Sequence, residues 1–306
     1  MTPKVLGIFG PTASGKTAVA EELARRLDAE LVSADAMQVY RGVPIITNQS
    51  DHPTRLVAVR ELHEEMSVAE YQERAHVAVD EIVGAGRVAV VVGGTGLYLR
   101  AALGGLELRP APPPGARERI ERLYDRLGGE RAHAALRARD PAAADRVHPN
   151  DRRRVVRALE LVEAGASLAP DRERLWSAEQ RHPTTIFGLD LSRDVLARRI
   201  EQRTREMVER GVVEEAKRAL AAHVSQTAAT IHGLRDFAEL PLEEAVAVYE
   251  QRVRRYAAYQ RKWMRRIPGI VIIDADRTPA EVADDILEVA RTRQRLSGHG
   301  TARADA

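Results

Sequence analysis

Near the start of the chain, residues 10–17 (GPTASGKT) match the pattern G-x-x-x-x-G-K-[ST] and follow the apolar run KVLGIF. The run predicts a buried strand, and residues 18–27 predict an amphipathic helix directly after the loop. Between a strand and a helix, such a loop points backbone N–H groups at a phosphate, and the helix dipole adds to the attraction. The predicted phosphate-binding residues are Gly10, Pro11, Thr12, Ala13, Ser14, Gly15, Lys16 and Thr17. Thr17 also offers a hydroxyl to a bound Mg²⁺.

Short β-branched runs alternate with helix-length amphipathic stretches along the rest of the chain. The runs lie at 4–9, 29–34, 87–94, 184–191 and 269–275. This alternation predicts an α/β fold with a P-loop NTPase-like parallel sheet flanked by helices. After a proline run near residue 110, the sequence becomes rich in Ala, Arg and Glu with no strand pattern, which predicts an inserted all-helical subdomain. We expect a catalytic core at 1–109 and 183–295, a helical insertion at 110–182 and a disordered tail at 296–306.

The amino-acid composition limits which metal centres and cofactors this chain could hold. The 306 residues include 44% hydrophobic residues and no cysteine, which excludes disulfides, iron–sulfur clusters and cysteine-bound zinc. Oxygen ligands and substrate phosphates remain, so Mg²⁺ is the expected cofactor. Without a long apolar stretch or a leader-like N-terminus, we expect a soluble cytoplasmic monomer with no membrane partner.

Positive charge is clustered although the formal net charge is only +2. One cluster is NDRRRVVRALE, and the segment 251–266 carries seven cationic side chains and no acid. A single run of this kind is commonly a solvated helix face. Two such runs favour a polyanionic partner larger than a nucleotide. Tyr256, Tyr259 and Trp263 lie at helical spacing in the second run, a stripe that is more often core-facing than base-stacking.

Residues at the ends of three predicted strands should meet, because ligands of parallel sheets bind beyond the strands' carboxyl ends. These ends carry the loop, Asp35 and Thr95. Asp35 could take a proton or hold Mg²⁺ through water, or simply cap the next segment. Thr95 lies in a glycine turn that either admits a ligand or only reverses the chain. The strand before Thr95 ends in glycines, without the carboxylate typical of ATPases, so a motor ATPase is disfavoured while a small kinase stays open.

Two arginines, Arg199 and Arg203, lie four residues apart on one predicted helix face. Such arginines can neutralise a phosphoryl group, or they can pair with exposed acids of the same helix.

Seven segments together resemble, in this order, the tRNA dimethylallyltransferase (tRNA isopentenyltransferase) family. They are GPTASGKT, SADAMQVYRG, VVVGGTGLY, DRVHPNDRRRVVRALE, IEQRTREMVERG, IHGLRDF and RRYAAYQRKWMRR, and the similarity extends from about residue 5 to about residue 290. The resemblance implies transfer of a dimethylallyl group from dimethylallyl diphosphate to N6 of the adenosine 3′-adjacent to the anticodon, with release of diphosphate. The partners it implies are dimethylallyl diphosphate and the anticodon stem-loop of tRNA.

The resemblance also assigns roles to individual positions. It implies that Asp35 is the reactive aspartate, that Thr95 lies near the target nucleotide and that Arg203 binds diphosphate. The implied tRNA contacts are Asp35, Ala36, Met37, Gln38, Thr95, Arg117, Arg153, Arg154, Val155, Val156, Arg157, Thr230, Ile231, His232, Gly233, Leu234 and Arg235, with the cationic helix at 258–265. The chain departs from the family pattern over 43–65, where a lysine and a histidine pair of that pattern are missing, so no contact is carried over there.

The residues suit this chemistry. The N6 amine is a weak nucleophile, so a base such as Asp35 must take its proton as the C–N bond forms. The loop would then hold a leaving group. Two other functions compete with this one: a small-molecule or nucleotide kinase using ATP at the same loop, and a nucleotide-gated RNA-binding protein that leaves Asp35 without a task. The related adenylate prenyltransferases are a further alternative, which the basic helical insertion disfavours.

Overall fold

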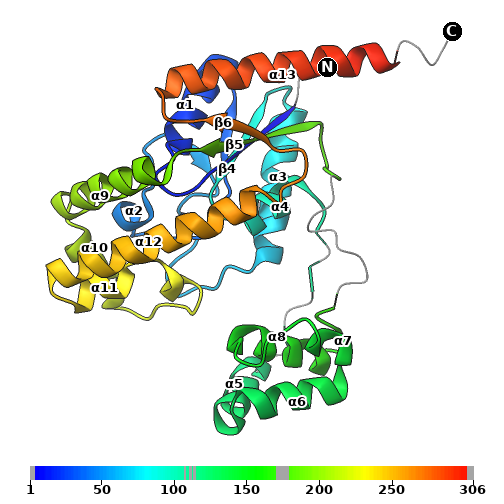
Figure 1. Ribbon diagram of the computed structural model, residues 1–306, viewed down its shortest axis with the longest axis vertical. Helices are drawn as coiled ribbons and strands as arrows, with labels where there is room; N and C mark the ends of the chain where they lie inside the picture. The colour runs from blue at the N-terminus through cyan, green and yellow to red at the C-terminus, as the bar shows by residue number, and fades with distance from the viewer. Residues whose placement is uncertain (1–3, 107, 110–111, 113–114, 170–178, 302–306) are drawn as a thin grey trace. The chain divides into compact units, whose positions relative to one another are not determined.

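The computed structural model describes the chain except residues 1–3, 107, 110–111, 113–114, 170–178 and 302–306 (Figure 1). It divides into two compact units, residues 1–106 with 175–306 and residues 107–174. The sequence analysis placed these divisions at 110 and 182, and residue 110 lies outside the described residues. The larger unit contains the sheet, and the smaller one is helical.

The sheet has six strands in the order β3-β2-β4-β1-β5-β6, all parallel (Figure 1). The strands are β1 (Val5–Phe9), β2 (Glu30–Ser33), β3 (Thr54–Arg55), β4 (Ala89–Gly93), β5 (Thr184–Asp190) and β6 (Val271–Asp274). The predicted parallel α/β sheet is therefore confirmed. The sequence analysis missed β3, because two residues are too few to show a strand pattern.

Helices cover both faces of the sheet. The larger unit contains α1 (Lys16–Leu27), α2 (Pro44–Thr47), α3 (Val68–Gly84), α4 (Gly96–Leu103), α9 (Arg193–Glu209), α10 (Val212–Leu220), η2 (Ala228–Thr230), α11 (Leu234–Glu239), α12 (Leu242–Met264) and α13 (Pro279–Thr301). α1 and α13 pack against one face, where Leu23 and Ile286 share a core cluster with Ile8. On the other face α4 brings Leu103 to 3.1 Å from where a Cβ on Gly7 would lie.

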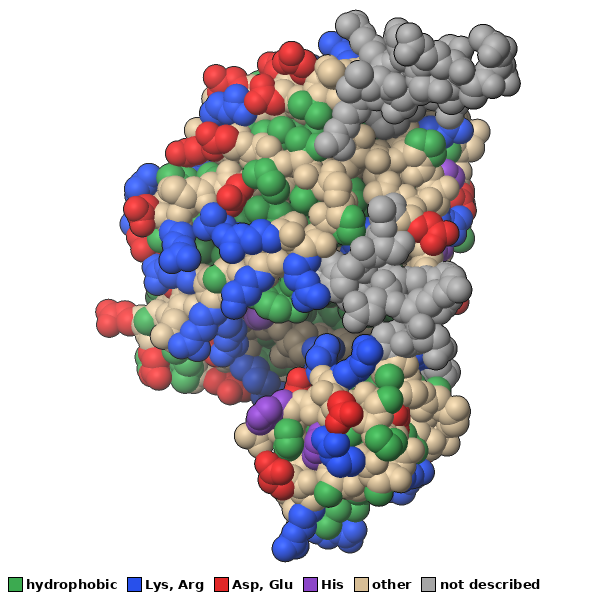
Figure 2. All heavy atoms as spheres, turned by 45° about the vertical axis from the view of Figure 1, so that its right-hand side comes forward, with side chains coloured by type: hydrophobic (Ala, Val, Ile, Leu, Met, Phe, Trp, Pro, Cys, Tyr) green, Lys and Arg blue, Asp and Glu red, His purple; other side chains and the backbone are tan. Residues whose placement is uncertain are grey.

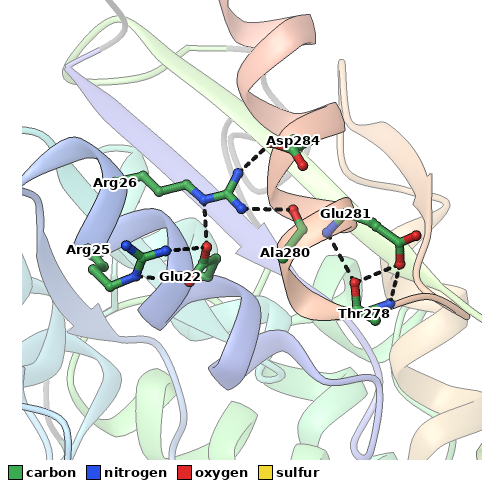
Figure 3. Close-up of polar contacts among 7 residues, drawn as sticks. All are labelled: Glu22, Arg25, Arg26, Thr278, Ala280, Glu281 and Asp284. Carbon is green, nitrogen blue, oxygen red and sulfur yellow. Dashed lines mark hydrogen bonds and ion pairs between the residues drawn. The ribbon is translucent and has the colours of Figure 1, made fainter.

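Polar contacts tie the first helix of the larger unit to its last (Figure 3). Arg26 of α1 donates to the carboxylate of Asp284 and to the carbonyl of Ala280. α13 itself begins with a capping box, in which Thr278 and Glu281 each accept from the other's backbone N–H. α13 extends to Thr301, whereas the sequence analysis expected a disordered tail from residue 296. Its small polar residues include no proline to end the backbone hydrogen-bond ladder.

The smaller unit has its own core. It contains α5 (Ala116–Leu127), α6 (Gly129–Arg139), α7 (Pro141–Ala144) and α8 (Arg152–Glu163). Asp151 caps α8, since its carboxylate accepts from the N–H of Arg154 at 3.1 Å. The core cluster includes Ile120, Tyr124, Leu136, Val155 and Leu159. Within the described part of the chain, no helix combines the length and apolar character needed to cross a membrane.

Candidate active site

The ends of β1, β2 and β4 meet at one cavity, as the sequence analysis expected. The phosphate loop after β1 contributes Thr12, Lys16 and Thr17 to its wall. The segment after β2 contributes Asp35, with Met37 and Gln38 beside it, and β4 contributes Gly93. Arg203 of α9 and a group of side chains from α12 complete the wall. Residues as far apart in the sequence as Thr12 and Gln260, which are separated by 248 positions, therefore line one cavity.

The phosphate loop has the geometry that its glycines predict. Gly15 adopts φ 84°, a left-handed conformation, and forms the N-cap of α1, which therefore begins at Lys16 rather than at residue 18. A Cβ on Gly10 would lie 2.6 Å from Oγ of Ser14. That hydroxyl is buried and has no hydrogen-bond partner among the described residues. The loop thus carries an unsatisfied polar group at the position where an anion is expected to bind.

Lys16 is the cation that the loop presents to the cavity. Desolvation lowers the pKa of its ammonium group to about 8, Asp35 acts in the opposite direction and Arg203 lowers it further. The nearest acceptor is the carbonyl of Pro11, 3.4 Å from Nζ. Because an anion in the cavity would replace lost solvation, the site favours a ligand that carries several negative charges.

Asp35 combines a local structural role with a free oxygen. Its Oδ1 accepts from the N–H of Met37 at 3.0 Å, which fixes the turn after β2. Oδ2 has no hydrogen-bond partner within the described part of the chain, and Asp35 lines the cavity. The alternative that Asp35 caps the next segment therefore accounts for one oxygen, through the bond from Met37, and leaves the other without a partner in the described part of the chain.

Thr95 fastens the glycine turn to the Asp35 segment. Its Oγ1 accepts from the N–H of Ala36 at 3.2 Å, so it positions the residue next to Asp35. A Cβ on Gly93 would lie 2.1 Å from the carbonyl oxygen of Ala34. The glycines that end β4 are therefore required for the close approach of two strand ends.

The two arginines of α9 have different surroundings. Arg203 donates from Nη1 to Oγ1 of Thr12 at 2.9 Å and lines the cavity. Arg199 instead reaches the carbonyl of Ala275 at 3.5 Å and the carboxylate of Asp276 at 3.4 Å, beyond the end of β6. Arg203 is thus the better placed of the pair to neutralise a leaving group.

The divergent segment 43–65 supplies another part of the cavity wall, which the sequence analysis did not anticipate. Ile46 of α2 and Val57 line the cavity. Glu215 of α10, only 2% exposed, accepts from the N–H groups of Ile45 and Ile46 at 2.9 and 2.8 Å. A buried carboxylate therefore holds the first turn of α2 in place.

The predicted tRNA-binding stretch 230–235 is only partly accessible. Ile231 and Leu234 are buried, so their side chains do not face solvent, and tRNA contact at these two positions stays a prediction. Thr230 and Arg235 are exposed. His232 lines the cavity, and its buried Nε2 has no hydrogen-bond partner among the described residues. Burial lowers the pKa of this imidazole, and the positive charge of Arg252 lowers it further.

The predicted tRNA-binding stretch of α8 is likewise only partly accessible. Val155 and Val156 are buried in the core of the helical unit, because inward-facing positions recur along any amphipathic helix. Arg153 and Arg154 are exposed and make no ion pair with a described residue. Arg157 pairs with the fully buried Glu160 at 3.0 Å, and Arg117 lies 3.6 Å from the same carboxylate.

The cationic helix α12 was expected to contact RNA, but part of it faces inward. Tyr256 lines the cavity beside Gln260, whereas Tyr259 is 54% exposed. The ring of Trp263 packs so closely that a Cβ on Gly96 would lie 2.3 Å from it. The aromatic stripe is therefore divided between the two sides of the helix. The sequence analysis placed Gln260 only within the stretch 258–265 and did not predict its contacts with Thr12 and Gly94, because these partners are remote in sequence.

The chain is similar in sequence to relatives of known type over most of its length. A family model described as IPP transferase matches residues 38–267. The tRNA dimethylallyltransferase of Anaeromyxobacter sp. (strain Fw109-5) is 40% identical over 298 residues, covering 92% of this chain and 97% of that protein. That of Geobacillus thermodenitrificans (strain NG80-2) is 36% identical over 278 residues, covering 87% and 88%.

Solved structures agree. The tRNA isopentenylpyrophosphate transferase of Bacillus halodurans is 31% identical with a TM-score of 0.69, covering 97% of this chain and 100% of that one. A eukaryotic dimethylallyltransferase, described as acting on tRNA, is 25% identical with a TM-score of 0.73, covering 90% and 74%. These relatives give the kinase alternative no support. By the family model and by its similarity to relatives over most of its length, the chain belongs to the IPP transferase family.

Proposed function

We propose that this chain transfers a dimethylallyl group from dimethylallyl diphosphate to N6 of the adenosine 3′-adjacent to the anticodon of tRNA. The observation that carries the proposal is a single cavity that holds Lys16 and Arg203 together with Asp35. Lys16 and Arg203 suit a diphosphate, and Asp35 presents a carboxylate to the same cavity. Membership of the IPP transferase family supports the same reaction.

The phosphate loop and Arg203 would stabilise the leaving group. As the bond between the allylic carbon and the diphosphate oxygen breaks, negative charge accumulates on the diphosphate. Lys16 and Arg203 already line the cavity in which that charge would develop, so little reorganisation would be needed. No carboxylate is required to activate water, because no water attacks phosphorus.

Asp35 would serve as the general base. The N6 nitrogen forms its bond to the allylic carbon and gives one proton to the free Oδ2 of Asp35, while diphosphate departs with the electrons of the broken C–O bond. The bond from Met37 to Oδ1 keeps the carboxylate oriented during this transfer. Thr95 holds the same segment from the other side.

The residues present also fit Mg²⁺. The described residues include no cluster of three or more His, Asp or Glu side chains suited to hold a metal by themselves. Thr17 and Asp35 line the cavity, and substrate phosphates with water would complete an oxygen shell of the type that Mg²⁺ prefers. The ion, when bound, would neutralise diphosphate charge. Thr17 would hold it through its hydroxyl.

tRNA would bind through arginines outside the cavity. Figure 2 shows a band of Lys and Arg side chains on the larger unit and further ones on the helical unit. Arg153 and Arg154 are exposed, and Arg117 and Arg157 are partly exposed. Guanidinium groups of this kind suit the phosphates of a stem-loop, whose target adenine must leave its stack to enter the cavity.

The test is an incubation of the chain with Mg²⁺ and labelled dimethylallyl diphosphate, offering either tRNA or AMP. The proposal expects label on tRNA at the adenosine next to the anticodon, found by nucleoside digestion. Label on AMP alone would point to an adenylate prenyltransferase. ATP consumption without label transfer would point to a kinase, and tRNA binding without either reaction to a nucleotide-gated RNA-binding protein.

A further inference from the structure

Gln260 occupies an unusual place for a residue of a cationic helix. It is 2% exposed and lies on the side of α12 that faces the cavity. Its Oε1 accepts from the N–H of Thr12 at 2.8 Å, and its Nε2 donates to the carbonyl of Gly94 at 2.8 Å. One amide thus joins the phosphate loop to the glycine turn after β4.

The turn is shaped to admit this amide. A Cβ on Gly94 would lie 2.3 Å from Nε2 of Gln260, 3.3 Å from the carbonyl oxygen of Gly10 and 3.4 Å from Cε of Lys16. Only a residue without a side chain leaves room for all three neighbours. The bare glycine and the buried glutamine therefore form one contact.

Hydrogen bonds extend this contact to Arg203, the residue predicted to bind diphosphate. The backbone N–H of Thr12 donates to Gln260, and the hydroxyl of Thr12 accepts from Arg203 at 2.9 Å. Tyr256, one turn before Gln260, also interacts with the side chains of Gln260 and Thr95. A continuous hydrogen-bonded path leads from the glycine turn through Gln260 and Thr12 to the guanidinium of Arg203.

We propose that Gln260 is a positioning residue for the diphosphate site, holding Thr12 so that Arg203 and the loop face the leaving group. The inference rests on the proposed function for its identification of the ligand. The opposite side of α12 presents Arg255, Tyr259 and Lys262 to solvent. The same helix therefore carries an RNA-type surface on one side and sets the loop geometry on the other.

The experiment compares wild type with Gln260→Met, which has similar length but no hydrogen-bonding amide. Gln260→Asn, which keeps the amide but is one methylene shorter, is the second variant should the first unfold. Gln251→Met, an exposed position of the same helix, is the matched control. The readouts are the Kd of inorganic pyrophosphate with Mg²⁺, the KM for dimethylallyl diphosphate, kcat, the Kd of an anticodon stem-loop and the melting temperature.

We expect Gln260→Met or Gln260→Asn to weaken pyrophosphate binding by roughly tenfold, because two buried groups lose their partners. KM should rise in parallel while stem-loop affinity stays within about twofold. In an Arg203→Ala background, where the path has lost its end, the same substitution should cost less than about threefold. A merely structural role would lower the melting temperature and leave the Kd of the folded fraction unchanged.

Pyrophosphate affinity equal to that of wild type in both Gln260 variants, or an equal loss with and without Arg203, would overturn the inference. Pyrophosphate binding is measured without any transfer step. A chain that shows the expected losses but never labels tRNA would therefore refute the proposed reaction and leave the positioning role standing.

Discussion

Arginine is used in two contrasting ways in the two units of this protein. In the larger unit, Arg203 is partly buried, donates a hydrogen bond to Thr12 and lines the cavity. In the helical unit, Arg153 and Arg154 extend from the first turn of α8 into solvent. A charge in a low-dielectric cavity interacts strongly with a neighbouring charge because little solvent screens it, whereas the interactions of an exposed charge are largely screened beyond about 8 Å at physiological salt. The first arrangement suits chemistry on one group, and the second suits a long polyanion.

The largest effect is expected inside the cavity, at Asp35. Asp35→Ala should lower the transfer rate by about 10³-fold, because the N6 proton loses its acceptor. Stem-loop affinity should stay within about twofold. The measurement is single-turnover label transfer at saturating tRNA, with Asp28→Ala, a 94% exposed carboxylate, as the control. Near-normal turnover of Asp35→Ala would contradict the general-base role.

The second-largest effect is expected at Arg203, the partly buried cation of the cavity. Arg203→Ala should lower kcat/KM for dimethylallyl diphosphate by roughly 10²- to 10³-fold, the usual cost of removing one group that stabilises developing charge. Arg205→Ala, at an exposed position of the same helix, is the matched control, and its effect should be much smaller. Equal losses in the two variants would show that distance to Thr12 does not decide the role.

These expectations rest on what sequence patterns can reach. The strand runs, the loop pattern and the polar residues after the strands predicted the sheet and the meeting of Lys16 with Asp35, because these features are local or follow from strand direction. Gln260 and Glu215 could not be predicted this way. Their partners Thr12 and Ile46 lie 248 and 169 residues away, and no local pattern marks such contacts.

Contiguous stretches also mislead in a helix. A run assigned to RNA contact necessarily includes inward positions, and Val155 and Val156 are such positions in α8. The same holds for Leu234 at the start of α11. The pattern identified the helices that carry the predicted surface, while burial decides which of their residues can reach a partner.

A smaller effect is expected for the exposed arginines of α8, and it concerns the binding of the stem-loop. Arg153→Ala and Arg154→Ala should each weaken stem-loop binding by roughly threefold to tenfold and lower the slope of log K against log salt by about 0.7 to 0.9. KM for dimethylallyl diphosphate should not change. Arg119→Ala, whose guanidinium pairs with Glu163, is the control within the same unit. An unchanged salt slope would mean that the α8 arginines do not contact phosphates.

The smallest effect is expected at His76 of α3, a titratable side chain that is partly buried. His76 donates from Nε2 to the carbonyls of Ala101 and Gly104, both at 2.9 Å. Its Nδ1 must then accept from Arg181, 2.7 Å away. Asp80 accepts from Arg181 at 2.6 Å. These contacts hold the chain where it leaves the larger unit and where it returns, and they require a neutral imidazole.

Burial lowers the pKa of His76, and Arg181 lowers it further against the opposing carbonyls and Asp80. The unfolded chain therefore binds more protons than the folded one as the pH falls through about 6.5, so acid destabilises the fold. His76→Gln keeps a polar side chain without this titration. Between pH 7.5 and 5.5 its melting temperature should fall less than that of wild type, by about 2 °C. The exposed His223→Gln is the control, and an identical fall in the His76 variant would contradict the neutral imidazole.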